Sequence, residues 1–191
     1  MTLPSHLLDA IASAAVREGL ADAVYTRLRT PIGTLLVVQG EHGVVRVGFP
    51  EESEDVLLAQ VAAGIGPRIV ASDRELAVTR DALSAYFEDE GESLDLPFDL
   101  SLVRSDFRRA ALKTLHDEVG PGAVVTYGAL AARIGHPKAA RAVGSACATN
   151  PVPIIVPCHR VLPGSGGVGS YGGGPERKRR LLAHEGATVR G

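Results

Sequence analysis

The sequence predicts an α+β protein of two domains, an N-terminal α/β domain over residues 1–95 and a mostly helical domain over residues 96–191. Three consecutive β-like runs between residues 24 and 49 indicate a small three-stranded antiparallel sheet in the first domain. An acidic stretch with Gly and Pro, residues 88–99, indicates the linker, and beyond it the β-pattern disappears. The net charge also changes sign between the halves. Residues 1–101 hold 7 Lys+Arg and 17 Asp+Glu, whereas residues 102–191 hold 13 Lys+Arg and 5 Asp+Glu.

The N-terminal half is expected to contain one helix, a meander of strands and then two further helices. The expected strands are residues 24–29, 34–39 and 44–49. The expected helices are residues 5–18, 51–63 and 72–88. Gly19 ends the first helix, and Ser72 with Glu75 forms a capping-box pattern at the start of the third.

The C-terminal half is expected to be built from helices. They are residues 105–119, 126–134, 138–148 and 175–184. Ser105 and Thr126 are the expected N-caps of the first two, and Pro175 suits the first position of the last. A tight Gly-His-Pro turn at 135–137 joins the second and third helices, which therefore resemble a helix-turn-helix, although such corners occur in any helical bundle.

The helix expected at 138–148 consists almost entirely of small side chains, with Arg141 as its long cation. Small side chains allow a helix backbone to approach another surface closely. That surface is either a neighbouring helix or a DNA groove, including the minor groove, which is about 6 Å wide. The positive charge of the C-terminal half favours a polyanionic partner, unless the two halves simply attract one another.

Residues 150–161, with the sequence NPVPIIVPCHRV, form the most informative segment. Each of the prolines fixes φ and removes a backbone donor, so a regular helix is excluded. Each also favours extended geometry in its predecessor. We therefore expect a stiff, mostly extended and buried rod that ends by presenting Cys158 and His159.

A nucleophilic cysteine reacts as the thiolate, so Cys158 needs a positive charge or a base nearby. His159 and Arg160 are candidates, and a remote carboxylate should orient the imidazole. Glu185 is the carboxylate candidate with a fixed position, beside a glycine that ends the last helix. A Cys-His pair alone is weak evidence, because many buried cysteines are inert core residues.

Several other classes of site are not expected. The glycine-rich residues 164–174 lack the ending of a phosphate-binding loop, and they suit a mobile wall with Tyr171 as a stacking surface, or a plain surface loop. The 6 His and 2 Cys have no metal-ligand spacing, so no metal or cofactor is expected. No apolar run approaches the roughly 20 residues that span a bilayer. With few cysteines and no secretion-signal pattern, a cytoplasmic location is expected.

Four segments together resemble the O6-alkylguanine-DNA alkyltransferases, the methylated-DNA–protein-cysteine methyltransferases. They are VTYG at 125–128, PKAARAVG at 137–144, NPVPIIVPCHRV at 150–161 and LLAHEG at 181–186. The N-terminal half matches more loosely, through TPIGTLL at 30–36 and Tyr86-Phe87. The resemblance implies a ribonuclease H-like sheet in the first domain and a winged-helix-like second domain with a helix-turn-helix.

The resemblance also implies DNA repair by direct damage reversal, in which Cys158 accepts the alkyl group of O6-alkylguanine in a single turnover. The implied partner is double-stranded DNA carrying the damaged guanine, bound in the minor groove with that base flipped out. O4-alkylthymine remains open as a second substrate. His159 would take the thiol proton through water, with Glu185 orienting it. Tyr127 would donate to the departing guanine, and Asn150 would brace the turn before the thiol.

The remaining implied roles concern DNA contact and the substrate pocket. The DNA-contacting residues are Thr126, Tyr127, Ala139, Ala140, Arg141, Gly144 and Ser145. The pocket residues are Cys147, Val161, Tyr171, Gly172 and Gly173. Arg141 would fill the gap that the flipped base leaves in the stack. The chain departs from the family pattern at Cys147, Ala148 and Pro175, and it is expected to act as a monomer without contact to a membrane.

Two other functions agree with parts of the sequence. A non-catalytic sensor of alkyl lesions on the same fold would lack the acceptor cysteine, and the intact Pro-Cys-His-Arg motif argues against it. A cysteine hydrolase using Cys158 and His159 would need an oxyanion pocket, which no segment evidently supplies, and it would leave the positive charge unexplained.

Overall fold

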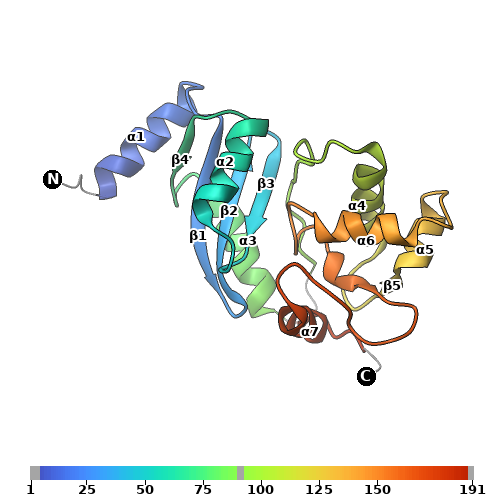
Figure 1. Cartoon of the computed structure of the whole chain (residues 1–191). Coiled ribbons are helices and arrows are strands. Elements are labelled where there is room, and N and C mark those ends of the chain that lie inside the picture. Colours follow the sequence, from blue (N-terminus) through green and yellow to red (C-terminus); the bar gives the residue numbers. More distant parts are fainter. Residues whose placement is uncertain (1–4, 90–92, 189–191) are drawn as a thin grey trace. The chain divides into compact units, whose positions relative to one another are not determined.

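The computed structural model describes residues 5–89 and 93–188, so residues 90–92 of the expected linker lie outside the described part. The chain forms two compact units, which Figure 1 shows in colours that follow the sequence. The first unit comprises Met1–Ala85 and Leu96–Leu102, and the second comprises Tyr86–Asp95 and Val103–Gly191. No helix in the described residues is long and apolar enough to cross a membrane.

The first unit is built on a four-stranded sheet with the strand order β3-β2-β1-β4. Its strands are β1 (Ala23–Thr30), β2 (Gly33–Gly40), β3 (Gly43–Gly48) and β4 (Ile69–Ala71). The first three pair antiparallel as a meander, which confirms the predicted small sheet. The fourth strand pairs parallel with β1 and was not predicted, because three residues are too few to show an alternating pattern.

The helices of the first unit are α1 (Ser5–Arg17), α2 (Glu54–Gly64) and α3 (Ala77–Glu88), whose last three residues belong to the second unit. Leu57 and Val61 of α2 pack in one apolar cluster with sheet residues that include Val38 and Val45. The expected start of the third helix at Ser72 is wrong. Ser72 Oγ accepts a hydrogen bond from the Glu75 amide (3.3 Å), but this bond closes a turn, and α3 begins only at Ala77.

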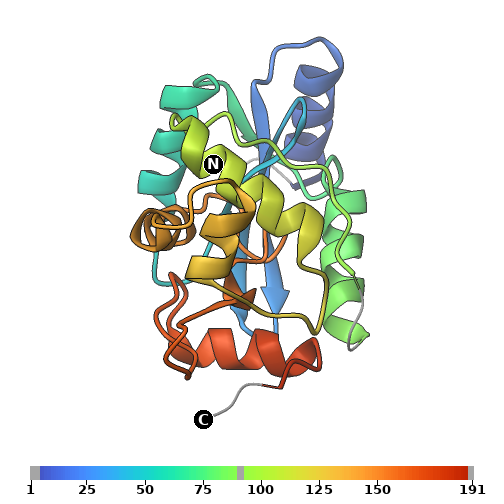
Figure 2. The same ribbon diagram turned by 90° about the vertical axis from the view of Figure 1, so that its right-hand side faces the viewer.

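The second unit contains α4 (Asp106–Glu118), α5 (Tyr127–Arg133), α6 (Ala140–Ala148) and α7 (Pro175–His184), and Figure 2 shows the same helices from a second direction. The two predicted caps are confirmed. Ser105 Oγ accepts from the Arg108 amide (3.4 Å) at the start of α4, and Thr126 Oγ1 accepts from the Ala129 amide (3.1 Å) at the start of α5.

A short ladder in the second unit was not predicted. The strand β5 (Val125–Thr126) pairs parallel with β6 (Val161–Leu162), so the β-pattern does not disappear completely after the linker. Each strand has two residues, which is too short for a sequence pattern to reveal. The ladder joins the residue before Tyr127 to the segment that immediately follows the 3-10 helix η1 (Cys158–Arg160).

Gly43 is a position where the fold of the first unit depends on the absence of a side chain. It has a φ of 131°, and a Cβ there would overlap the carbonyl group of Pro97. We expect Gly43→Ala to lower the free energy of unfolding by about 2–4 kcal/mol, through strain and displacement of this segment. The exposed Gly120 has open space around its Cα, so Gly120→Ala should change stability by less than about 0.5 kcal/mol. Urea denaturation of both variants checks this, and equal effects would contradict it.

Candidate active site

Residues 150–157 fold back on themselves just before Cys158, so the expected extended rod is wrong. The amide of Val156 donates to the carbonyl of Val152 (2.9 Å), and Ile154 has a φ of 78°. Asn150 fixes this turn, since its Nδ2 donates to Val156 O (2.8 Å) and its Oδ1 accepts from Val152 N (3.1 Å). The prolines exclude a regular helix as predicted, but these side-chain bonds compensate a left-handed conformation that is rare for a β-branched residue.

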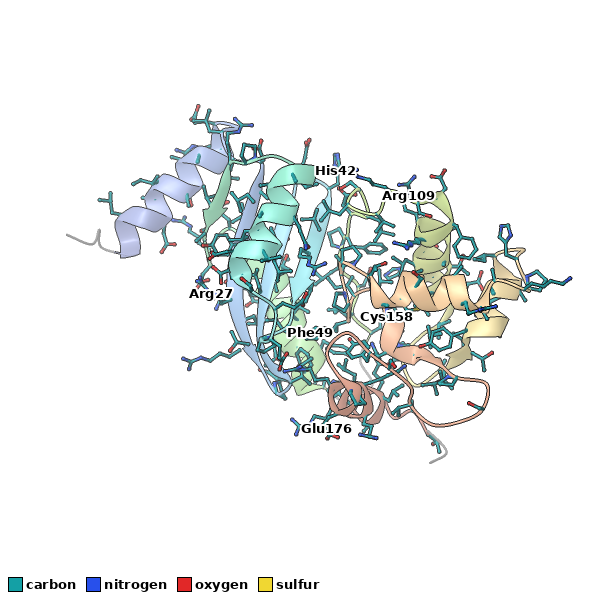
Figure 3. The ribbon with its side chains drawn as sticks, viewed as in Figure 1. Arg27, His42, Phe49, Arg109, Cys158 and Glu176 are labelled. Atoms are coloured by element: carbon teal, nitrogen blue, oxygen red, sulfur yellow. The ribbon has the colours of Figure 1, made fainter. Side chains whose placement is uncertain are left out.

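The thiol of Cys158 is buried and protonated. Cys158 is the first residue of η1, is 4% exposed, and lies inside the second unit in Figure 3. Its sulfur lies 3.2 Å from Asn150 Nδ2. Burial raises the pKa of Cys158 to about 11, although the Asn150 hydrogen bond and the Lys178 charge oppose this effect. Because a thiol with this pKa is not ionised near neutral pH, the group needs a base to react.

His159 is fully buried and its two ring nitrogens have different environments. Nε2 lies 2.9 Å from Glu185 Oε1, whereas Nδ1 has no hydrogen-bond partner in the described part of the chain. Burial lowers the pKa of His159, so the ring is neutral near pH 7. Since the carboxylate of Glu185 can only accept, Nε2 carries the proton and Nδ1 is left as an acceptor.

Glu185 follows α7 directly and is ionised although it is buried. Burial opposes ionisation, but hydrogen bonds from Arg160 and His159 hold the pKa of Glu185 down at about 2. Arg160 approaches the carboxylate with two nitrogens, Nε to Oε2 and Nη2 to Oε1, each at 2.8 Å. A third nitrogen of Arg160 donates to the carbonyl of Val119. The arginine of the Pro-Cys-His-Arg motif therefore neutralises the carboxylate that orients the histidine.

Two residues of this site had no role in it predicted from the sequence, although Tyr86 is part of the family resemblance. Lys178 is completely buried, and its Nζ donates to Val161 O (2.7 Å) and Ser170 O (3.3 Å). It lies in a run of basic residues, but its spacing of three and four from the buried Leu181 and Leu182 indicates an inward position. Tyr86 is buried at the end of α3, and its hydroxyl donates to Glu185 Oε1 (2.7 Å). No sequence spacing connects two residues so far apart.

The expected DNA-contacting residues lie on α5, α6 and the positions just before them. Arg141 is exposed on α6, and Thr126 is exposed before α5. Tyr127 is half-buried, and its ring lies against Gly144, where an added Cβ would be 3.9 Å away. Ser145 is already engaged, since its hydroxyl accepts from Arg108 Nη2 (3.1 Å). Ala139 and Ala140 are half-buried at the start of α6.

The expected pocket residues have different environments. The ring of Tyr171 stands edge-on to His159, with 6.4 Å between the ring centroids. The carbonyl of Val161 is bound by Lys178, and that of Gly173 accepts from Arg177 Nη1 (2.8 Å). Gly172 is exposed, while Cys147 on α6 is half-buried with a pKa raised by burial. Within the described residues, no group of three His, Cys, Asp or Glu side chains could hold a metal ion.

Comparison with known proteins gives consistent matches over most of the chain. The family model described as 6-O-methylguanine DNA methyltransferase, DNA binding domain, matches residues 106–187, and the corresponding ribonuclease-like domain matches residues 23–100. The methylated-DNA–protein-cysteine methyltransferase of Mus musculus is 46% identical over 85% of this chain and 81% of its own length. The methyltransferase of Homo sapiens is 37% identical over 84% of this chain and 79% of its own length.

Solved structures from Mycobacterium tuberculosis have the same fold. Its O6-methylguanine methyltransferase is 33% identical, with a TM-score of 0.72, over 85% of this chain and 92% of that chain. Its OGT in complex with DNA is 35% identical, with a TM-score of 0.68, over the same shares of 85% and 92%. The two family models match residues in both units, and the DNA-binding-domain model includes Cys158.

Replacing Glu185 by Gln removes the charge that compensates the buried Arg160. We expect a loss of about 3–5 kcal/mol in the free energy of unfolding near pH 7. The folded-state pKa of Glu185 is lowered from its usual 4.5 to about 2. Its ionisation therefore stabilises the fold above about pH 4.5, and this contribution is lost as the pH falls towards 2.

Urea denaturation over this pH range measures the effect, and the difference between the wild type and Glu185→Gln should shrink as the pH falls. Glu176→Gln is the matched control, because Glu176 on α7 is exposed and pairs only with exposed arginines among the contacts described. It should leave stability nearly unchanged at every pH. A wild-type advantage over Glu185→Gln that stays constant with pH would contradict the assignment.

Proposed function

The chain belongs to the family of methylated-DNA–protein-cysteine methyltransferases, and we propose that Cys158 is the residue that accepts the alkyl group. The protein repairs O6-alkylguanine in DNA by moving the alkyl group to one of its own cysteines. In the proposed reaction the sulfur attacks the alkyl carbon, an S–C bond forms, and the bond from carbon to O6 breaks. The thioether has no good leaving group, so each chain acts once.

The observation that carries this proposal is the buried series Cys158, His159 and Glu185. The neutral imidazole has one nitrogen occupied by Glu185 and the other unpartnered in the described residues, as a general base requires. We propose that His159 Nδ1 takes the thiol proton through a water molecule as the S–C bond forms. Glu185 then stabilises the imidazolium. Asn150 braces the turn and donates to the sulfur.

The departing guanine leaves as an anion unless a proton donor stands near it. We propose Tyr127 as this donor, because the residue is half-buried and burial raises the pKa of its phenol, which keeps the hydroxyl protonated. The pocket would be lined by Cys147, Val161, Tyr171, Gly172 and Gly173, with backbone carbonyls of Cys158 and Val161 contacting the base. The carbonyl of Val161 already accepts from Lys178, and its second lone pair remains for this contact.

DNA is the partner of this family, and the mycobacterial relative named above was solved in complex with it. We propose that the second unit, predicted as residues 96–191, is the DNA-binding and alkyl-acceptor domain, separate from the N-terminal domain predicted over residues 1–95. Near this boundary Leu96–Leu102 belong to the first unit and Tyr86–Asp95 to the second. Helix α6 would enter the minor groove of double-stranded DNA, with contacts from Thr126, Tyr127, Ala139, Ala140, Gly144 and Ser145. Arg141 would fill the gap left by the flipped guanine. We further propose a monomer acting in the cytoplasm, where reducing conditions keep the thiol free.

Intact-mass measurement after incubation with O6-methylguanine DNA tests the acceptor. The wild type should gain the mass of one methyl group, on a peptide that contains Cys158, and then stop reacting. Cys158→Ala should gain none, because the nucleophilic sulfur is absent. Cys147→Ala is the matched control for loss of a thiol and should still gain one methyl group. A methyl group on the Cys147 peptide, or repeated turnover, would overturn the proposal.

Arg141→Ala tests the proposed role in base flipping. Unstacking a base costs a few kcal/mol, and an arginine in the vacant position recovers part of this in duplex DNA. We expect methyl transfer from duplex DNA to slow by about tenfold or more, and transfer from the single strand to slow much less. Arg179→Ala removes another exposed cation, from α7, and serves as the control. Equal slowing on duplex and single strand would contradict a role in filling the gap.

A further inference from the structure

The carboxylate oxygen that orients His159 has a third donor besides His159 and Arg160. Glu185 Oε1 lies 2.9 Å from His159 Nε2, 2.8 Å from Arg160 Nη2 and 2.7 Å from the hydroxyl oxygen of Tyr86. Tyr86 is 2% exposed and precedes Glu185 by 99 residues. The distances to the three donors are similar, so they share the electron density of a single oxygen.

The direction of the Tyr86 hydrogen bond is fixed by the two groups that form it. Glu185 is ionised and can only accept a hydrogen bond. Burial raises the pKa of Tyr86 well above the ordinary value of a phenol, so its hydroxyl keeps the proton and donates. The ring is held in place by edge-on contacts with Phe87 and His184, both with 5.0 Å between ring centroids. The hydroxyl therefore has a defined position beside the carboxylate.

The polar groups around His159 determine how strongly its ring holds a second proton. They are the Glu185 carboxylate after α7, the Arg160 guanidinium and Cys158 thiol of η1, the Lys178 ammonium of α7, and the phenols of Tyr86 and Tyr171. Among these, Glu185 is the group that favours the imidazolium. A hydrogen bond to the carboxylate spreads its negative charge and weakens its pull on the Nε2 proton.

We propose that Tyr86 is a positioning residue for alkyl transfer: its hydroxyl withdraws charge from Glu185 Oε1, so that His159 stays neutral and its Nδ1 can accept the Cys158 proton. This inference rests on the roles proposed above for Cys158 and His159. The thiol proton ends on His159, the alkyl carbon on sulfur and the electron pair of the broken bond on O6. Tyr86 neither gains nor loses a proton.

Tyr86→Phe tests the inference, because it removes the hydroxyl and keeps the ring that packs against Phe87 and His184. The rate of a single methyl transfer is measured against pH, between about pH 5.5 and pH 9. Without the hydroxyl the carboxylate favours the imidazolium more strongly. The acid limb of the profile, where the rate falls because His159 is protonated, should therefore move to higher pH by about one unit. The rate should fall by up to about tenfold near pH 6 and change little above pH 8.

Tyr25→Phe is the matched control, because Tyr25 is half-buried on β1 of the first unit and should leave the profile unchanged. A second variant carries 3,5-difluorotyrosine at position 86. Its more acidic phenol donates more strongly, so the acid limb should move in the opposite direction. This variant decides the question if Tyr86→Phe does not fold.

The possible outcomes separate the inference from the proposed function. An acid limb that stays in place, or a rate that falls equally at every pH, would overturn the role of Tyr86 while the methyl group still arrives on Cys158. A wild type that transfers no methyl group to Cys158 would overturn the proposed function instead. Opposite shifts in the two position-86 variants would support the inference.

Discussion

The second unit depends on one buried negative charge, the carboxylate of Glu185. Placing an unpaired carboxylate in a protein interior costs several kcal/mol, even after relaxation. Arg160, His159 and Tyr86 provide the compensating hydrogen bonds, the first two from η1 and the third from the end of α3. One of the hydrogen bonds that compensate the buried carboxylate is therefore the bond that orients His159. Stability and chemistry are set here by the same contacts.

The sulfur of Cys158 differs from the carboxylate of Glu185, because its burial is not fully compensated and keeps the thiol protonated. A permanently ionised thiolate would react with oxidants and with unrelated electrophiles, which a protein that acts only once cannot tolerate. A protonated thiol next to a neutral imidazole stays inert until an alkyl carbon is presented. In the proposed reaction, ionisation of the thiol and formation of the S–C bond are coupled in one step. The cations Arg160 and Lys178 stabilise the site mainly by satisfying carbonyl and carboxylate oxygens.

The parts of the fold that were predicted correctly are those that depend on neighbouring residues. Ser105 and Thr126 cap helices through bonds to amides three residues away, and such local chemistry is visible in the sequence. The extended rod expected before Cys158 was wrong because the turn there depends on a side chain, Asn150, bonded to a carbonyl six residues away, a contact that only the family resemblance implied. Lys178 was recognisable from its spacing to buried leucines, whereas the bond between Tyr86 and Glu185 required the tertiary fold.

The small side chains of α6 are compatible with both interpretations of this helix, close packing within its own unit and close approach to a DNA groove. Val143 and Ala146 are completely buried, so one face of the helix packs against its own unit. Arg141, Ala142 and Ala148 are exposed, so another face carries little beyond one long cation. Gly144 lies between these faces, against the ring of Tyr127. The small residues on the exposed face lie within one helix turn of Gly144, which contacts the Tyr127 ring. The proposed approach to DNA and the placement of the phenol therefore both require small side chains on this helix.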